Sequence, residues 1–124
     1  MNPIWSPDGN LIVYTGAQVN VVMPLLAVRP DGEPVELPAI EVFRFGQRAR
    51  FLPDGSGLVY MQGNGPSQDF WLLDLATLES RRLTQLGAAA TMMTFDVTSD
   101  GRRIVFDRLS EDSDIVLIEL KPAR

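Results

Sequence analysis

The chain has 124 residues, of which 45% are hydrophobic and 22% charged, a composition typical of one globular domain with a buried core. Cysteine and histidine are both absent, which excludes disulfides, thiolate or imidazole metal ligands, and catalytic triads that use histidine as the base. A formal net charge of −5 opposes binding to the phosphate backbone of nucleic acids. We therefore expect no catalytic residue, no metal, no cofactor and no nucleic-acid partner.

Four short β-strands are predicted in the first part of the chain. Residues 1–6 are expected to form the innermost strand, and Pro-Asp-Gly at 7–9 the turn that follows it. β-Branched and aromatic residues then lead through a second strand to Tyr14. A third and a fourth strand are predicted over residues 24–28 and 34–37.

The same order of strands is expected twice more along the chain. The predicted strands that follow the later turns cover residues 57–61, 70–75, 80–83, 102–107 and 115–120. Phe70 and Trp71 are neighbours on one of them, so their side chains should face opposite sides, one of them into a core. Only four residues follow Leu120, and the third unit therefore lacks its fourth strand.

A fixed interval of 46 residues relates the three units. It separates the turn residues Asp8-Gly9, Asp54-Gly55 and Asp100-Gly101, and also Val13, Val59 and Val105. Four short antiparallel strands in each unit of this length are typical of a β-propeller blade. We predict an all-β fold, a β-propeller fragment in which residues 1–124 form one segment of about three four-stranded blades. The blades should span about residues 1–40, 41–87 and 88–124, the last without its outer strand.

Two stretches carry a resemblance to a known family. Trp5-Ser-Pro-Asp-Gly, followed by Phe-Trp-Leu-Leu-Asp-Leu and Arg-Arg-Leu-Thr within residues 70–84, resembles the TolB-like, WD-repeat-like propeller repeat of bacteria. Residues 95–120 are similar to the C-terminal blade of such propellers. The third unit departs from the pattern, because Val97 and Ser99 replace the aromatic residue and the proline of the earlier turns. The resemblance implies a non-catalytic module that binds a protein or peptide partner at the mouth of the propeller channel.

An incomplete ring leaves several arrangements open, because a blade needs neighbours to bury its faces. The chain is the C-terminal part of a larger propeller, or half of a six-bladed ring closed by a homodimer, or an open arc. The alternative function is a propeller segment of a larger, peptidase-like enzyme whose catalytic domain is absent here. Asp96 and Asp107 are then the carboxylates to consider. A purely architectural segment is a further hypothesis.

Candidate partner-binding residues gather at the innermost strand of the second blade: Arg44, Gln47, Arg48 and Arg50. Arginines that line a channel can hold an acidic group, although pairing with neighbouring carboxylates is the commoner arrangement. The connections at residues 37–48, 63–69, 87–93 and 109–113 are the loops expected to meet a partner.

Two acidic patterns raise the question of calcium. The three turn aspartates belong to three different hairpins, which favours turn chemistry over the six to eight converging oxygens that Ca²⁺ requires. The group Asp107, Glu111, Asp112 and Asp114 lacks the glycine and the bidentate glutamate of a calcium loop, which favours a solvated loop.

The apolar segments are too short to cross a bilayer, which takes roughly 20 residues, so we expect no membrane insertion. No basic leader precedes an apolar stretch, so no signal peptide is expected in this chain. A periplasmic location and the cytoplasmic face of a bacterial cell both stay open.

Overall fold

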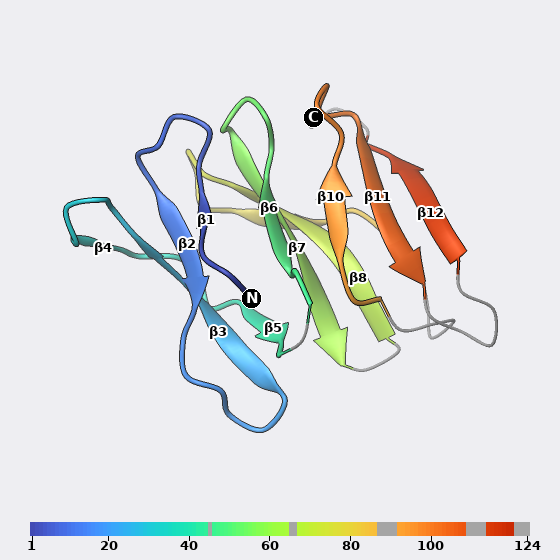
Figure 1. Ribbon diagram of the computed structural model, residues 1–124, viewed down its shortest axis with the longest axis horizontal. Helices are drawn as coiled ribbons and strands as arrows, with labels where there is room; N and C mark the ends of the chain where they lie inside the picture. The colour runs from blue at the N-terminus through green and yellow to red at the C-terminus, as the bar shows by residue number, and fades with distance from the viewer. Residues whose placement is uncertain (45, 65–66, 87–91, 109–113, 121–124) are drawn as a thin grey trace.

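The computed structural model describes residues 1–44, 46–64, 67–86, 92–108 and 114–120. These residues form three antiparallel β-sheets that follow one another across the molecule in chain order (Figure 1). The described residues contain strands and turns but no helix. The predicted all-β propeller fragment is confirmed.

Each sheet pairs its strands as consecutive hairpins, except for one additional strand in the first. The first sheet contains β1 (Ile4–Trp5), β2 (Ile12–Thr15), β3 (Val22–Val28), β4 (Pro34–Val35) and β5 (Glu41–Phe43). The second contains β6 (Ala49–Phe51), β7 (Gly57–Asn64), β8 (Ser67–Asp74) and β9 (Ser80–Arg82). The third contains β10 (Phe95–Val97), β11 (Arg103–Arg108) and β12 (Asp114–Glu119).

The repeated valines occupy the same register position in every blade. Val13 pairs with Ala27, Val59 with Leu72, and Val105 with Leu117, in each case across the second and third strands. The 46-residue interval of the sequence is therefore an interval between equivalent places in three sheets.

Strand β5 lies where the sequence predicted only a connection. It pairs with the beginning of β3, with Met23 opposite Val42. The Leu25 amide donates to the Ile40 carbonyl (2.9 Å), whereas the Pro24 carbonyl accepts from the Gly16 amide on the β2 side. Neighbouring residues of a strand point to opposite edges, so β5 and β4 share the outer edge of β3. The outer strand of the first blade is thus divided into two short pieces.

The second blade is buried on both faces, which explains the continuous apolar run of β7. Leu58 and Tyr60 belong to a core cluster shared with the first blade. Val59 and Met61, which alternate with them, belong to a second cluster shared with the third blade. Successive side chains of a strand face opposite sides, so one strand supplies both cores.

Phe70 and Trp71 lie on opposite faces of β8, as predicted. Phe70 is fully buried in the second cluster, and its ring lies edge-on to those of Phe95 and Phe106, with centroids 5.0 and 5.1 Å away. Trp71 is half-buried against the first cluster and stacks on Tyr60.

The Asp-Gly pairs form the turns between the first and second strands of the three blades. Each aspartate accepts a hydroxyl hydrogen bond within its own turn, Asp8 from Ser6 (2.6 Å) and Asp100 from Thr98 (2.6 Å). Asp54 accepts from both the amide and the hydroxyl of Ser56. The glycine that follows adopts a φ of 72–78° in all three turns, a conformation that side chains other than glycine rarely adopt.

These hydrogen bonds predict acid sensitivity of the fold. The hydroxyl bonds from Ser6, Ser56 and Thr98, with the turn amides, lower the pKa of Asp8, Asp54 and Asp100 from the ordinary value of an aspartate. A carboxyl group whose pKa is lowered by folding stabilises the fold above its unfolded pKa, and this contribution is lost as the pH falls through the folded value.

We therefore expect a free energy of unfolding that is nearly constant from pH 7 to pH 5 and falls below about pH 4. Urea titrations at several pH values, with Asp→Asn at all three positions, measure the effect. The substituted chain should show a flatter acid limb, and Ser56→Ala a partial version of the same change. An unchanged acid limb would contradict the assignment.

Candidate functional site

Arg50 joins the inner strands of the second and third blades. Its Nε donates to the Phe95 carbonyl (3.2 Å) and lies 3.6 Å from the Asp96 Oδ1. Figure 1 shows β6 and β10, the strands that carry these residues, side by side. Both charged side chains reach solvent, so the ion pair adds little stability by itself. It does hold a cation at the inner side of the junction between these blades.

Gln47 and Arg44 lie in the segment that leads into β6. The Gln47 Nε2 donates to the Ala49 carbonyl (3.2 Å) and approaches the Met1 sulfur at 3.8 Å, so it ties the N-terminus to the second blade. The Arg44 amide donates to the Val21 carbonyl, and its side chain is exposed. Partner binding by Arg44 and Arg50 stays a prediction.

Arg48 lies inside the molecule. Its Nη1 donates to the Gln68 Oε1 (2.9 Å) and the Met92 carbonyl (2.7 Å), and its guanidinium carbon lies 5.6 Å from the centre of the Phe43 ring. Burial lowers the pKa of Arg48 to about 10, a shift that the negative charge of Asp107 opposes. The side chain is therefore still charged at neutral pH, and it links β5, β8 and the segment before β10. Of the four predicted residues, Arg48 is buried, Gln47 and Arg50 are partly buried and Arg44 is exposed.

Asp96 and Asp107, the two carboxylates considered for catalysis, are both engaged in local hydrogen bonds. The Asp107 Oδ1 accepts from the Met93 and Thr94 amides (2.8 and 3.1 Å), which fixes the entry to β10. The Asp96 Oδ1 accepts from the Val97 amide as well as pairing with Arg50. Each carboxylate thus has a structural role.

The acidic group Asp107, Glu111, Asp112 and Asp114 raised the question of a calcium site. Glu111 and Asp112 lie outside the described residues. Among the residues that the structure does describe, no group of three or more acidic side chains is placed to hold a metal ion. The three turn aspartates belong to separate hairpins, each occupied by its own turn.

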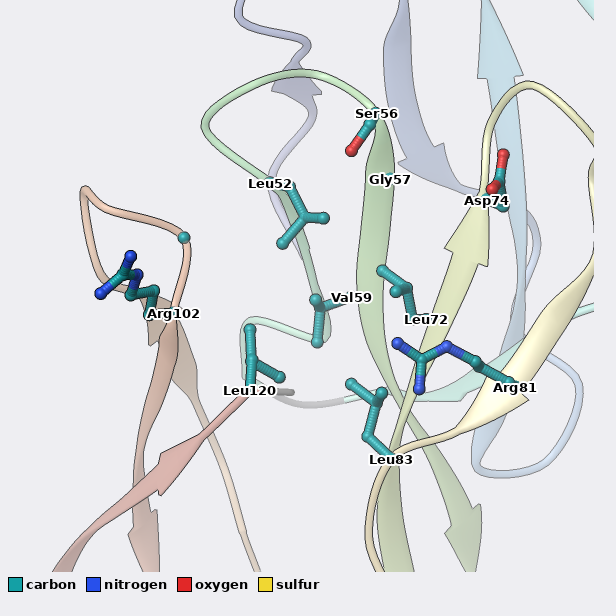
Figure 2. Close-up of a pocket in the computed structure, with 11 residues that line it drawn as sticks. Leu52, Ser56, Gly57, Val59, Leu72, Asp74, Arg81, Leu83, Arg102 and Leu120 are labelled. Atoms are coloured by element: carbon teal, nitrogen blue, oxygen red, sulfur yellow. The ribbon is translucent and has the colours of Figure 1, made fainter. Parts of the chain in front are cut away.

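A cavity of about 260 Å³ opens between the second and third blades, and nothing in the sequence reasoning anticipated it. Its apolar wall consists of leucine and valine side chains from both blades: Leu52, Val59, Leu72, Leu83 and Leu120. Arg81, Arg102 and Asp74 stand at its rim. Figure 2 shows the two arginines on opposite sides of the apolar wall. Comparison of positions 46 residues apart is the signal that could have revealed the cavity.

The outer face of each terminal blade carries exposed apolar side chains. On the first blade Trp5 is 58% exposed, and on the third blade Ile115 and Leu117 are 81% and 53% exposed. These residues lie on the sides of their sheets that face away from the two core clusters.

Consecutive antiparallel sheets of five, four and three strands, with cores between them, define a segment of a β-propeller. Solved structures with this fold include TolB from Acinetobacter baumannii, with a TM-score of 0.73, 19% identity and coverage of 95% of this chain and 29% of that one. They also include the putative TolB from Agrobacterium tumefaciens, with a TM-score of 0.69, 18% identity and coverage of 96% and 46%. The TolB-like resemblance seen in the sequence is confirmed at the level of the fold.

An enzyme also contains this fold. The Pyrococcus horikoshii acylaminoacyl peptidase matches with a TM-score of 0.65, 15% identity and coverage of 96% of this chain and 22% of that one. The chain thus spans less than half the length of each of these proteins. No protein-family model matches the sequence, and no curated protein matches it. No helix among the described residues is long and apolar enough to span a membrane.

Proposed function

We propose that this chain is a non-catalytic TolB-like propeller module that binds protein or peptide partners, and that its outer blade faces bind further blades of the same kind. The observation that carries the proposal is the repeat itself. Trp5, Ile12 and Tyr14 stand 46 residues before Phe51, Leu58 and Tyr60. In the second blade these three positions pack against the first blade. The open face of the first blade therefore carries apolar residues at the positions that, in the second blade, pack against a neighbouring blade.

The open face of the third blade has the complementary character. Val105 and Leu117 are the equivalents of Val59 and Leu72, which face the third blade from the second. Between the second and third blades, the equivalent face of the second blade packs against the face of the third blade that corresponds to the open face of the first. The two open faces of one chain can therefore contact the two open faces of a second copy, which closes a six-bladed ring. In a longer chain, additional blades would occupy the same faces.

Light scattering after size exclusion, over a range of concentrations, tests this proposal on the 124-residue chain. We expect a mass of about twice 13.7 kDa. Trp5→Glu or Leu117→Glu places an unpaired charge in the contact and should return the chain to a monomer. Val19→Glu is the matched control, because Val19 is 63% exposed but lies between β2 and β3, outside both faces. If the unaltered chain stays monomeric at all concentrations, that result would contradict a ring closed by two copies.

A propeller segment of a larger, peptidase-like enzyme is the second candidate function. The structural likeness to the acylaminoacyl peptidase supports it. A hydrolase domain encoded beside this segment would favour the enzyme, and an adjoining domain of another class would favour the interaction module.

A further inference from the structure

The cavity between the second and third blades arises where the chain departs from its own repeat. At the first junction Leu11, Val35 and Leu37 pack against the core cluster. The residues 46 positions later are Gly57, Arg81 and Leu83. Two of three apolar side chains are thus replaced, one by hydrogen and one by a charged group. At the second junction Leu52 and Leu72 pack against Gly57, and the position of Val35 is taken by the charged side chain of Arg81.

The packing around Gly57 leaves no room for a side chain. A Cβ atom at this position would lie 2.9 Å from the Leu72 Cδ1, 3.1 Å from the Leu73 carbonyl oxygen and 3.2 Å from the Leu52 Cδ1. The backbone oxygen is held by the β7–β8 ladder, since Gly57 is paired with Asp74. The glycine and the cavity wall therefore belong to one close-packed arrangement, and the empty space is part of the junction.

The charges at the rim define the ligand more closely than the apolar wall does. Arg81 and Arg102 are exposed on opposite sides of the opening, and among the described residues no ion pair of either side chain with an acidic group is found within 4.0 Å. Asp74 adds a carboxylate to the same rim. A ligand that complements all of these groups carries an apolar body, a carboxylate for an arginine and an N–H donor for the aspartate.

We infer that this cavity binds the C-terminal residue of a partner protein, with its aliphatic or aromatic side chain inside and its α-carboxylate on Arg81. A terminal residue carries the apolar side chain, the carboxylate and an amide N–H on one Cα atom. The size agrees, because a cavity of roughly 150 Å³ holds benzene and this one measures about 260 Å³. The inference rests on the proposed function and names the partner's chemistry.

Fluorescence anisotropy with a labelled peptide, fluorescein-Gly-Ser-Gly-Ser-Leu with a free carboxylate, tests the inference on the unaltered chain. Saturable binding is expected. Amidation of the C-terminus, or replacement of the terminal leucine by glycine, should each weaken binding about tenfold, since each removes one of the two principal interactions. Amide chemical-shift changes in ¹H–¹⁵N spectra should centre on Gly57, Leu83 and Gly101.

Substitutions in the chain provide the second arm. Arg81→Gln should weaken binding by about three- to tenfold, and Arg81→Val, which restores the residue type of the first junction, should do the same. Arg102→Gln, on the opposite side of the opening, should have a smaller effect. Arg103→Gln is the matched control, because Arg103 is the exposed neighbour of Arg102 but does not line the cavity. Variants that keep their dispersed spectra keep the fold, so a loss of binding in them is specific.

Three results would overturn the inference: equal binding of the acid and the amide, shifts that map elsewhere, or free leucine binding as tightly as the peptide, which would identify an amino-acid site. Failure here is distinguishable from failure of the proposed ring. A chain that is monomeric but binds the peptide contradicts only the ring, and a dimer without peptide binding contradicts only the cavity's role.

Discussion

Replacement of Arg48 by alanine is expected to lower the free energy of unfolding by about 3–5 kcal/mol, as when one member of a buried polar network is removed. The side chain is completely buried, and its Nη1 is a hydrogen-bond donor to both the Gln68 side chain and the Met92 carbonyl. The substitution leaves these two acceptors in the interior and opens a cavity beside Phe43.

Comparison with Arg48→Met separates the two causes. Methionine retains most of the volume and avoids a buried charge, so the loss should shrink to the cost of the unsatisfied acceptors, about 1–3 kcal/mol in total. Arg44→Ala is the control, because an exposed arginine should change the free energy by less than about 0.5 kcal/mol. Urea unfolding of the four chains measures all of these values. A loss below about 1 kcal/mol for Arg48→Ala would show that Arg48 does not hold the junction together.

Arg48 also illustrates where sequence reasoning ends. Its place beside Arg44, Gln47 and Arg50 indicated a charged surface at an inner strand. Its burial depends on Gln68 and Met92, which are 20 and 44 residues away in the chain. No local pattern contains that information, because contacts between blades are set by how whole sheets pack.

The parts of the fold that local chemistry dictates were predictable. Asp-Gly turns and alternating apolar strands are short-range signals, and three copies at a constant interval identified the blades. Strand β5 shows the opposite case. Glu41–Phe43 is too short to predict as a strand, and it forms because β3 begins at Val22 and offers an unpaired edge beyond β4.

The cavity was predictable in principle from the same repeat. Constant positions such as Val59 identify the blade, whereas departures such as Gly57 and Arg81 show where one junction differs from the next. The first kind of residue specifies the fold, and the second kind marks a local surface that the fold does not require. The candidate site therefore depends on the exceptions to the 46-residue pattern.

Replacement of Phe70 by alanine is the other change with a large expected effect, a loss of about 3–5 kcal/mol in the free energy of unfolding. Phe70 is fully buried and contacts the rings of Phe95 and Phe106, both from the third blade. The side chain is thus the centre of the only core that joins β10–β12 to the rest of the described structure.

In repeat architectures the stability is approximately a sum of the blades and of the junctions between neighbours. Loss of Phe70 weakens one junction and leaves the first core cluster, with Leu58 and Tyr60, intact. The third blade should then unfold before the others. Hydrogen exchange should show early loss of protection in β11, while β2 and β7 keep theirs. Val19→Ala is the control: Val19 is 63% exposed and lies outside both open faces, and its truncation should cost less than about 1 kcal/mol. Simultaneous loss of protection in all three sheets would contradict the additive picture and indicate that the blades fold as one unit.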